Sequence, residues 1–86
     1  MALVHFGLEQ QRFTGGAREV ELEAANVKQL IAKLEARFPG IGPLLESSAV
    51  AINGEIVNDA AYEPVPAGAE IYFVVKAAGG TERNEQ

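Results

Sequence analysis

The sequence predicts an α+β domain, in which a mixed sheet of four or five strands packs on one main helix. Two observations carry this prediction. Apolar and polar residues alternate in segments near the N-terminus, and Glu70–Lys76 is a short apolar run, as in strands. Between them, apolar residues recur at helical spacing over residues 27–38. Because 86 residues suffice for only one small domain, we assign it to residues 1–76 and a C-terminal tail to residues 77–86.

The first strand is predicted over Ala2–Leu8, with Leu8 at the end of its apolar side. Gly15-Gly16 then turns the chain, since glycine tolerates the backbone angles of tight turns. The second strand is predicted over Arg18–Glu23, where Glu19, Glu21 and Glu23 form one solvated face. We expect the two strands to pair as a hairpin.

The main helix is predicted from five apolar residues that fall on one helical face: Val27, Leu30, Ile31, Leu34 and Phe38. Asn26 is placed to cap its N-terminus, with Gln29 as the return partner of a capping box. Pro39-Gly40 is expected to end the helix.

The second half of the chain is predicted to hold short strands. A helical turn over Pro43–Ser48 precedes a strand over Ala49–Asn53. Asn53-Gly54 is a strong tight-turn signal, after which Glu55–Val57 runs back. The last strand, Glu70–Lys76, is apolar on both faces, which is typical of a central strand.

Composition excludes several classes of function. The chain has no cysteine and one histidine, His5, so we expect neither thiolate chemistry nor a metal site. Its net charge of −5 is a poor match for nucleic acid and suits a basic protein partner. No apolar run reaches the length of a membrane span, and the N-terminus lacks signal-peptide features, so we expect a cytoplasmic protein without membrane attachment.

Three segments carry a resemblance to a known family: NVKQLIAKLEARFPG, AVAINGEIVND and VPAGAEIYFVVKAAGG. Together with the order of elements, they resemble the MoaD/ThiS-type sulfur carriers, whose fold is the ubiquitin-like β-grasp. The likeness spans about residues 2–80, and the closing segment is its most specific part.

The resemblance implies a function for the glycine pair. In that family an E1-like enzyme adenylates the terminal glycine carboxylate, a sulfur donor protein converts it to a thiocarboxylate, and an acceptor synthase subunit receives the sulfur. Gly80 matches the attachment residue. The residues before it would thread a partner's channel: Lys76, Ala77, Ala78 and Gly79. ATP and Mg²⁺ would belong to the activating partner, because this chain has no phosphate-binding loop, and the chain itself would not be an enzyme.

The chain departs from the family pattern at Thr81–Gln86, because family carriers usually end at the glycine pair. Three accounts stay open: a peptidase removes this extension, the extension is retained, or it is a cloning or gene-boundary artefact. The functional alternatives are a ubiquitin-like protein modifier joined through Gly80 and a non-catalytic interaction module with a retained tail. The sulfur acceptor is equally open between molybdopterin-like cofactor synthesis and another sulfur metabolite.

The aromatic candidates for an exposed docking patch are Tyr72, Phe13 and Tyr62, and Val74 lies beside Tyr72. Tyr72 and Val74 share a strand face beside the tail; the alternative is that they merely form the second face of a central strand. His5 fits a solvated or packed strand position better than a catalytic base, since no second histidine or cysteine accompanies it.

Overall fold

The structure, a computed structural model, describes residues 1–75, and of Val75 only the backbone. Its elements are β1 (Ala2–His5), α1 (Leu8–Thr14), β2 (Glu19–Leu22), α2 (Val27–Arg37), α3 (Ile41–Glu46), β3 (Ser48–Ile52), β4 (Glu55–Val57) and β5 (Glu70–Val75). The predicted end of the last strand at Lys76 and the tail over residues 77–86 lie outside the described residues.

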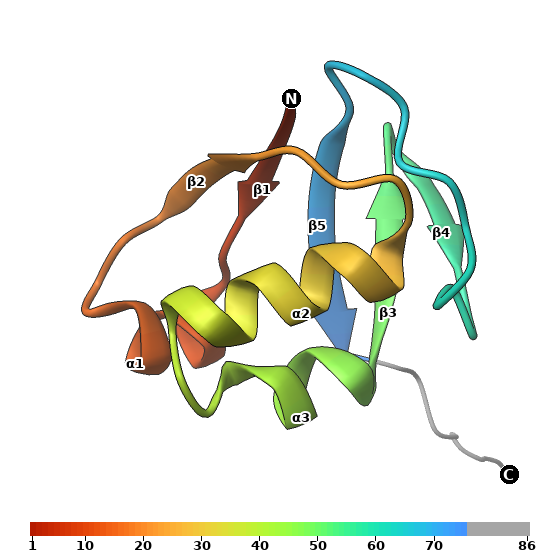
Figure 1. Cartoon of the computed structure of the whole chain (residues 1–86). Coiled ribbons are helices and arrows are strands. Elements are labelled where there is room, and N and C mark those ends of the chain that lie inside the picture. Colours follow the sequence, from red (N-terminus) through yellow and green to blue (C-terminus); the bar gives the residue numbers. More distant parts are fainter. Residues whose placement is uncertain (76–86) are drawn as a thin grey trace, which may run out of the picture.

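The strands form one five-stranded sheet in the order β2-β1-β5-β3-β4. β1 and β5 run parallel, whereas β1 with β2, β3 with β4 and β3 with β5 run antiparallel. Helices α2 and α3 both lie on one side of this sheet (Figure 1). The predicted mixed sheet and the central place of the last strand are therefore confirmed.

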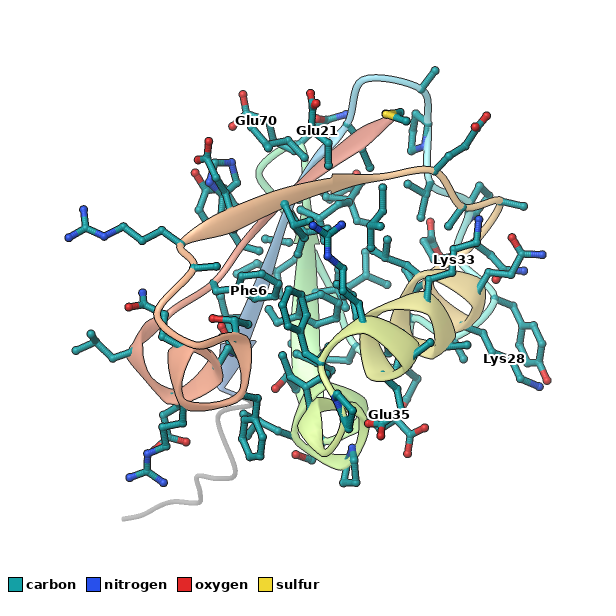
Figure 2. All side chains as sticks on the ribbon, turned by 60° about the vertical axis from the view of Figure 1, so that its left-hand side comes forward. Phe6, Glu21, Lys28, Lys33, Glu35 and Glu70 are labelled. Atoms are coloured by element: carbon teal, nitrogen blue, oxygen red, sulfur yellow. The ribbon has the colours of Figure 1, made fainter. Side chains whose placement is uncertain are left out.

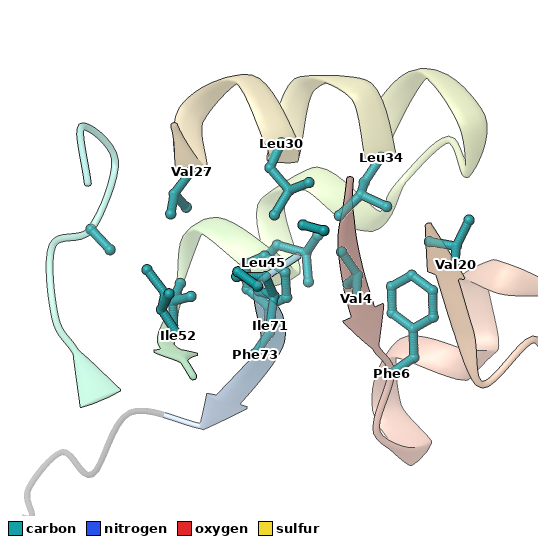
Figure 3. Close-up of a cluster of buried hydrophobic side chains, with 14 of the residues drawn as sticks. Val4, Phe6, Val20, Val27, Leu30, Leu34, Leu45, Ile52, Ile71 and Phe73 are labelled. Carbon is teal, nitrogen blue, oxygen red and sulfur yellow. The ribbon is translucent and has the colours of Figure 1, made fainter. Parts of the chain in front are cut away.

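The core lies between the two helices and the sheet (Figure 3). Leu30 and Leu34 of α2 and Leu45 of α3 pack on Val4 and Ile71 of the central strands, and each of these side chains is at most 1% exposed. Burying one such side chain contributes roughly 1.5–3 kcal/mol. The helical stripe predicted from the sequence is thus the surface that α2 turns to the sheet.

Helix α2 begins as predicted, because Asn26 caps it. The Asn26 side chain accepts a hydrogen bond from the backbone N–H of Gln29 at 2.9 Å. The return bond differs from a capping box: the Gln29 side chain accepts from the N–H of Ala25, one residue before the cap. The helix ends at Arg37, just before Pro39-Gly40.

The tight turn between β3 and β4 is confirmed. Asn53 and Gly54 have φ angles of 51° and 87°, the left-handed conformation that these two residue types tolerate best. The Asn53 side chain also accepts a hydrogen bond from the N–H of Glu70 at 2.9 Å. This contact ties the turn to the start of β5.

The prediction of a strand continuing to Leu8 is wrong, because β1 ends at His5 and Leu8 begins the short helix α1. The Leu8 side chain is 84% exposed, so it does not continue the apolar side of β1. Gln10 is buried instead, and its side chain accepts from the N–H of Gly7 and donates to the carbonyl of Phe73. Polar contacts within α1 and to β5 therefore override the alternation that suggested a strand.

The role predicted for Gly15-Gly16 needs a related correction. β1 and β2 pair antiparallel, as predicted, but α1 lies between them, so Gly15-Gly16 is not by itself the hairpin turn. Gly15, with φ 69°, is the left-handed cap that ends α1, and its N–H donates to the carbonyl of Gln11. The helical segment predicted from Pro43 also begins earlier, at Ile41.

Candidate functional site

The face of the sheet turned away from α2 and α3 carries the candidate site, which we call the open face. Successive side chains of a strand point to opposite faces of the sheet, so the strand residues that do not face the core lie on the open face. They are Leu3 and His5 of β1, Glu19 and Glu21 of β2, Glu70, Tyr72 and Val74 of β5, Ala49 and Ala51 of β3, and Ile56 of β4. Figure 2 shows Glu21 and Glu70 on the side away from Lys28 and Glu35 of α2.

The open face has an acidic half built around His5. The imidazole ring stacks on the ring of Tyr72, with centroids 4.3 Å apart and planes 7° from parallel. Its Nδ1 lies 3.7 Å from Glu19 Oε1, and its Nε2 lies 3.6 Å from Glu70 Oε1. Both carboxylates are more than half exposed and His5 is largely covered. The acidic charge therefore faces solvent, while the His5 ring packs against the ring of Tyr72.

The other half of the open face is apolar. Ala51 of β3 pairs with Tyr72 of β5 on one side and with Ile56 of β4 on the other. Ala49 of β3 pairs with Val74 of β5. The small alanines are buried between the larger side chains, whereas Tyr72 is 44% and Ile56 is 64% exposed. Exposed aromatic and aliphatic groups beside a charged border are typical of protein interfaces.

The structure separates the predicted patch residues. Tyr62 lies in the segment after β4, beside Lys28 of α2. Tyr72 and Val74 lie together on the open face. Phe13 lies on α1. Its ring packs against Gly40, in the connection between α2 and α3, and leaves little room for a side chain there. Ile56 was missed from the sequence, although the alternation of the β3–β4 hairpin places it on the same face as Ala51.

The residues predicted to carry the chemistry, Gly80, Gly79 and the segment Lys76–Ala78, lie outside the described residues. The described part of β5 ends at Val75, which pairs with Ser48 at the start of β3. The roles predicted for Lys76–Gly80 stay predictions.

Comparison with known proteins identifies the family. The sequence profile of the ThiS family matches residues 4–80, which is most of the chain. The chain belongs to the ThiS family. This membership confirms the resemblance to MoaD/ThiS-type sulfur carriers, and the mixed sheet with its helices is the β-grasp fold that the resemblance implied.

Solved structures share the fold of this ThiS-family chain. A chain of the BexX/CysO complex from Amycolatopsis orientalis is 27% identical, with a TM-score of 0.79 over 93% of this chain and 100% of its own. CysO from Mycobacterium tuberculosis is 17% identical, with a TM-score of 0.78 over 87% of this chain and 98% of its own. A chain from the complex of subunits 1 and 2 of molybdopterin-converting factor of Helicobacter pylori is 22% identical, with a TM-score of 0.63 over 92% and 97%. No curated protein sequence matches significantly.

Two other features are absent from residues 1–75 of this ThiS-family chain, a metal-binding cluster and a membrane-spanning helix. Within that range, no three histidine or acidic side chains gather in a way that would hold a metal ion. Nor does any helix there have the length and apolar character needed to cross a membrane.

Proposed function

We propose that this ThiS-family chain is a sulfur carrier whose reactive group is the carboxylate of Gly80. The observation that carries the proposal is the extent of the family match, which ends at residue 80, on the glycine pair that follows β5. The six residues Thr81–Gln86 stand beyond that match. The match thus includes the glycine pair and stops with it.

The proposed chemistry follows from the weak electrophilicity of a carboxylate. The Gly80 carboxylate attacks the α-phosphorus of ATP on an E1-like enzyme, which releases pyrophosphate and leaves an acyl adenylate. Sulfide released by a sulfur donor protein then attacks the acyl carbon, the bond to AMP breaks, and departure of AMP leaves a thiocarboxylate on Gly80. ATP and Mg²⁺ are held by the activating enzyme, so the chain acts as its substrate and not as a catalyst.

Residue types before Gly80 suit delivery into another protein's site. Glycine and alanine keep the segment thin, and glycine accepts backbone angles that other residues avoid. Lys76–Gly80, when extended, spans roughly 16–18 Å, enough to bring the acyl carbon into a catalytic site of a partner. The acceptor synthase subunit would receive the sulfur through the same segment, in synthesis of a molybdopterin-like cofactor or of another sulfur metabolite.

The open face is the proposed docking surface for these partners. Its apolar half, centred on Tyr72, would be buried in the contact, and its acidic half would attract a basic surface. The relatives from Amycolatopsis orientalis and Helicobacter pylori were each solved in complexes of two proteins, which supports a function exercised through protein partners.

The proposal requires that a peptidase removes Thr81–Gln86, because Gly80 otherwise has no free carboxylate. The test compares a chain ending at Gly80 with the full-length chain and with Gly80→Ala in the shortened form. Each is incubated with the host's E1-like enzyme, ATP, Mg²⁺ and sulfur donor, and intact mass is measured. We expect only the shortened wild-type chain to gain the mass of one oxygen replaced by sulfur.

Two results would contradict this function. One is equal modification of the full-length chain, in which Gly80 has no free carboxylate, because the sulfur would then be added at another group. The other is a chain in the native host that is always full-length and never modified, which would favour an interaction module. Isopeptide-linked adducts in host extracts, without any thiocarboxylate, would instead assign the chain as a protein modifier.

A further inference from the structure

A groove of about 940 Å³ lies on the helix side of the sheet, away from the open face. Its floor and sides are apolar and come from four parts of the chain: Val27, Ile31 and Ala32 of α2, Leu45 of α3, Val50 of β3, and Ala60 after β4. Val27, Leu45 and Val50 are at most 2% exposed, so the groove reaches down to the core. It shares no lining residue with the open face.

The walls of this groove are held in place by hydrogen bonds. The segment after β4 is fixed to the start of α2, because the N–H groups of Val27 and Lys28 donate to the carbonyls of Glu63 and Ala61 at 3.0 Å and 2.7 Å. The Lys28 ammonium lies 5.5 Å from the centre of the Tyr62 ring, a cation–π distance. The groove is therefore formed in the free chain, which lowers the ordering cost of filling it.

The opposite wall is also fixed. Glu35 of α2 accepts hydrogen bonds from the N–H groups of Gly40 and Gly42 at 2.9 Å and 2.6 Å, which joins α2 to the start of α3. The spacing of the two helices along the groove thus depends on a carboxylate at its edge and not only on packing.

The shape of the groove favours a protein segment over a small molecule. Small-molecule pockets enclose most of their ligand's surface. Here the walls are largely open to solvent, and Ala32, Pro43 and Ala61 are exposed along them. Tyr62, at 76% exposure, stands at the rim as an aromatic group available for contact. Open apolar grooves of this kind accept a segment of another protein.

Charge decides which segment fits. The rim carries the acidic residues Glu35, Glu46 and Asp59 and the single cation Lys28. A second copy of the chain, with a net charge of −5, would be repelled. The chain's own residues 76–86 contain no apolar residue larger than alanine, so they offer nothing to fill the apolar floor. The complementary occupant is an apolar segment that also carries lysine or arginine.

We propose that this α2–α3 groove is a second docking site, which binds an amphipathic, cationic segment of a partner protein. Because the groove and the open face lie on opposite sides of the sheet, the chain can contact two proteins at once. The proposal does not depend on the chemistry at Gly80.

The test uses the full-length, ¹⁵N-labelled chain and a short amphipathic helical peptide of leucine and lysine as the probe. We expect saturable shifts of the backbone amides of α2, of α3 and of residues 59–62, while the amides of His5 and Tyr72 stay in place. Ala32→Arg fills the groove and should weaken binding at least about tenfold. Ala36→Arg is the matched control, since Ala36 is an exposed alanine of the same helix that does not line the groove.

A leucine–glutamate peptide of the same pattern tests the charge argument and should bind at least about tenfold more weakly. The proposal is overturned if the shifts map to the open face or if binding does not saturate. It is equally overturned if Ala36→Arg weakens binding as much as Ala32→Arg, or if the acidic peptide binds as well as the basic one.

Discussion

The imidazole ring of His5 lies parallel to the phenol ring of Tyr72, 4.3 Å away, so that a histidine on β1 supports an exposed aromatic side chain on β5. The two residues are direct neighbours in the parallel register of these strands. The His5 ring also lies 3.7 Å from a carboxylate oxygen of Glu19 and 3.6 Å from one of Glu70. A rigid, half-exposed aromatic group with a charged border has the properties of an interface anchor.

Replacement of Tyr72 by alanine should therefore weaken docking of the activating enzyme. Anchors of this kind cost about 2 kcal/mol or more when truncated, which corresponds to about thirtyfold in the dissociation constant. Isothermal titration of the chain with the host's E1-like enzyme measures the effect. Leu8→Ala, which truncates an 84% exposed residue on α1, is the control and should bind as wild type. Equal affinities of Tyr72→Ala and wild type would remove the open face from this contact.

A second prediction separates the core from the surface. Leu30→Ala should lower the free energy of unfolding by about 2–5 kcal/mol, because Leu30 is fully buried between α2 and the sheet. Leu8→Ala should change it by less than about 0.5 kcal/mol, since Leu8 is exposed at the start of α1. Urea unfolding of both variants gives the two values. A large loss for Leu8→Ala would mean that Leu8 packs in the core, as a continued strand would require.

The elements that the sequence predicted well are those with local signals. The apolar stripe of α2, the Asn26 cap and the Asn53-Gly54 turn each depend on residues close together in the chain, and each stands in the structure. Helix α1 was not predicted, because Leu8 fits the alternation of a strand as well as it fits a helix. What decides between them is Gln10, whose side chain bonds to Phe73, 63 residues away.

The candidate site divides in the same way, between features with local sequence signals and features that depend on contacts between distant segments. Alternation along β5 places Tyr72 and Val74 on one face, and this was visible in the sequence. That Phe13 belongs elsewhere depends on its contact with Gly40, which follows from how α1 packs on the connection between α2 and α3. The α2–α3 groove could not be predicted, since its lining comes from segments between Val27 and Tyr62 that meet only in the folded chain.

The buried amide of Gln10 gives a third prediction. Gln10→Met keeps the size of the side chain but leaves the N–H of Gly7 and the carbonyl of Phe73 without this partner. The expected loss of stability is about 1–3 kcal/mol, the cost of unsatisfied buried polar groups. Glu9→Met, on the exposed side of the same helix, should cost less than about 0.5 kcal/mol. Hydrogen exchange of the Gly7 amide should become faster in Gln10→Met alone; an unchanged rate would show that the bond does not protect it.

The last prediction concerns the pH dependence of stability through Glu35. Hydrogen bonds from the N–H groups of Gly40 and Gly42 lower the pKa of the Glu35 carboxyl below its ordinary value of 4.5. A carboxyl whose pKa is lower in the folded state stabilises the fold above its unfolded-state pKa, and this contribution is lost as the pH falls through the folded-state value. Glu35→Gln provides one acceptor oxygen where the carboxylate provides two, so it should unfold at a lower urea concentration at pH 7. The gap to wild type should narrow as the pH falls from 4.5 through the lower folded-state pKa, where wild type itself becomes protonated. Glu55→Gln, at an exposed position of β4, should show no comparable gap at pH 7 or at acidic pH. A gap for Glu35→Gln that stays constant throughout the acidic range in which wild type is folded would mean that the charge of Glu35 does not hold the start of α3.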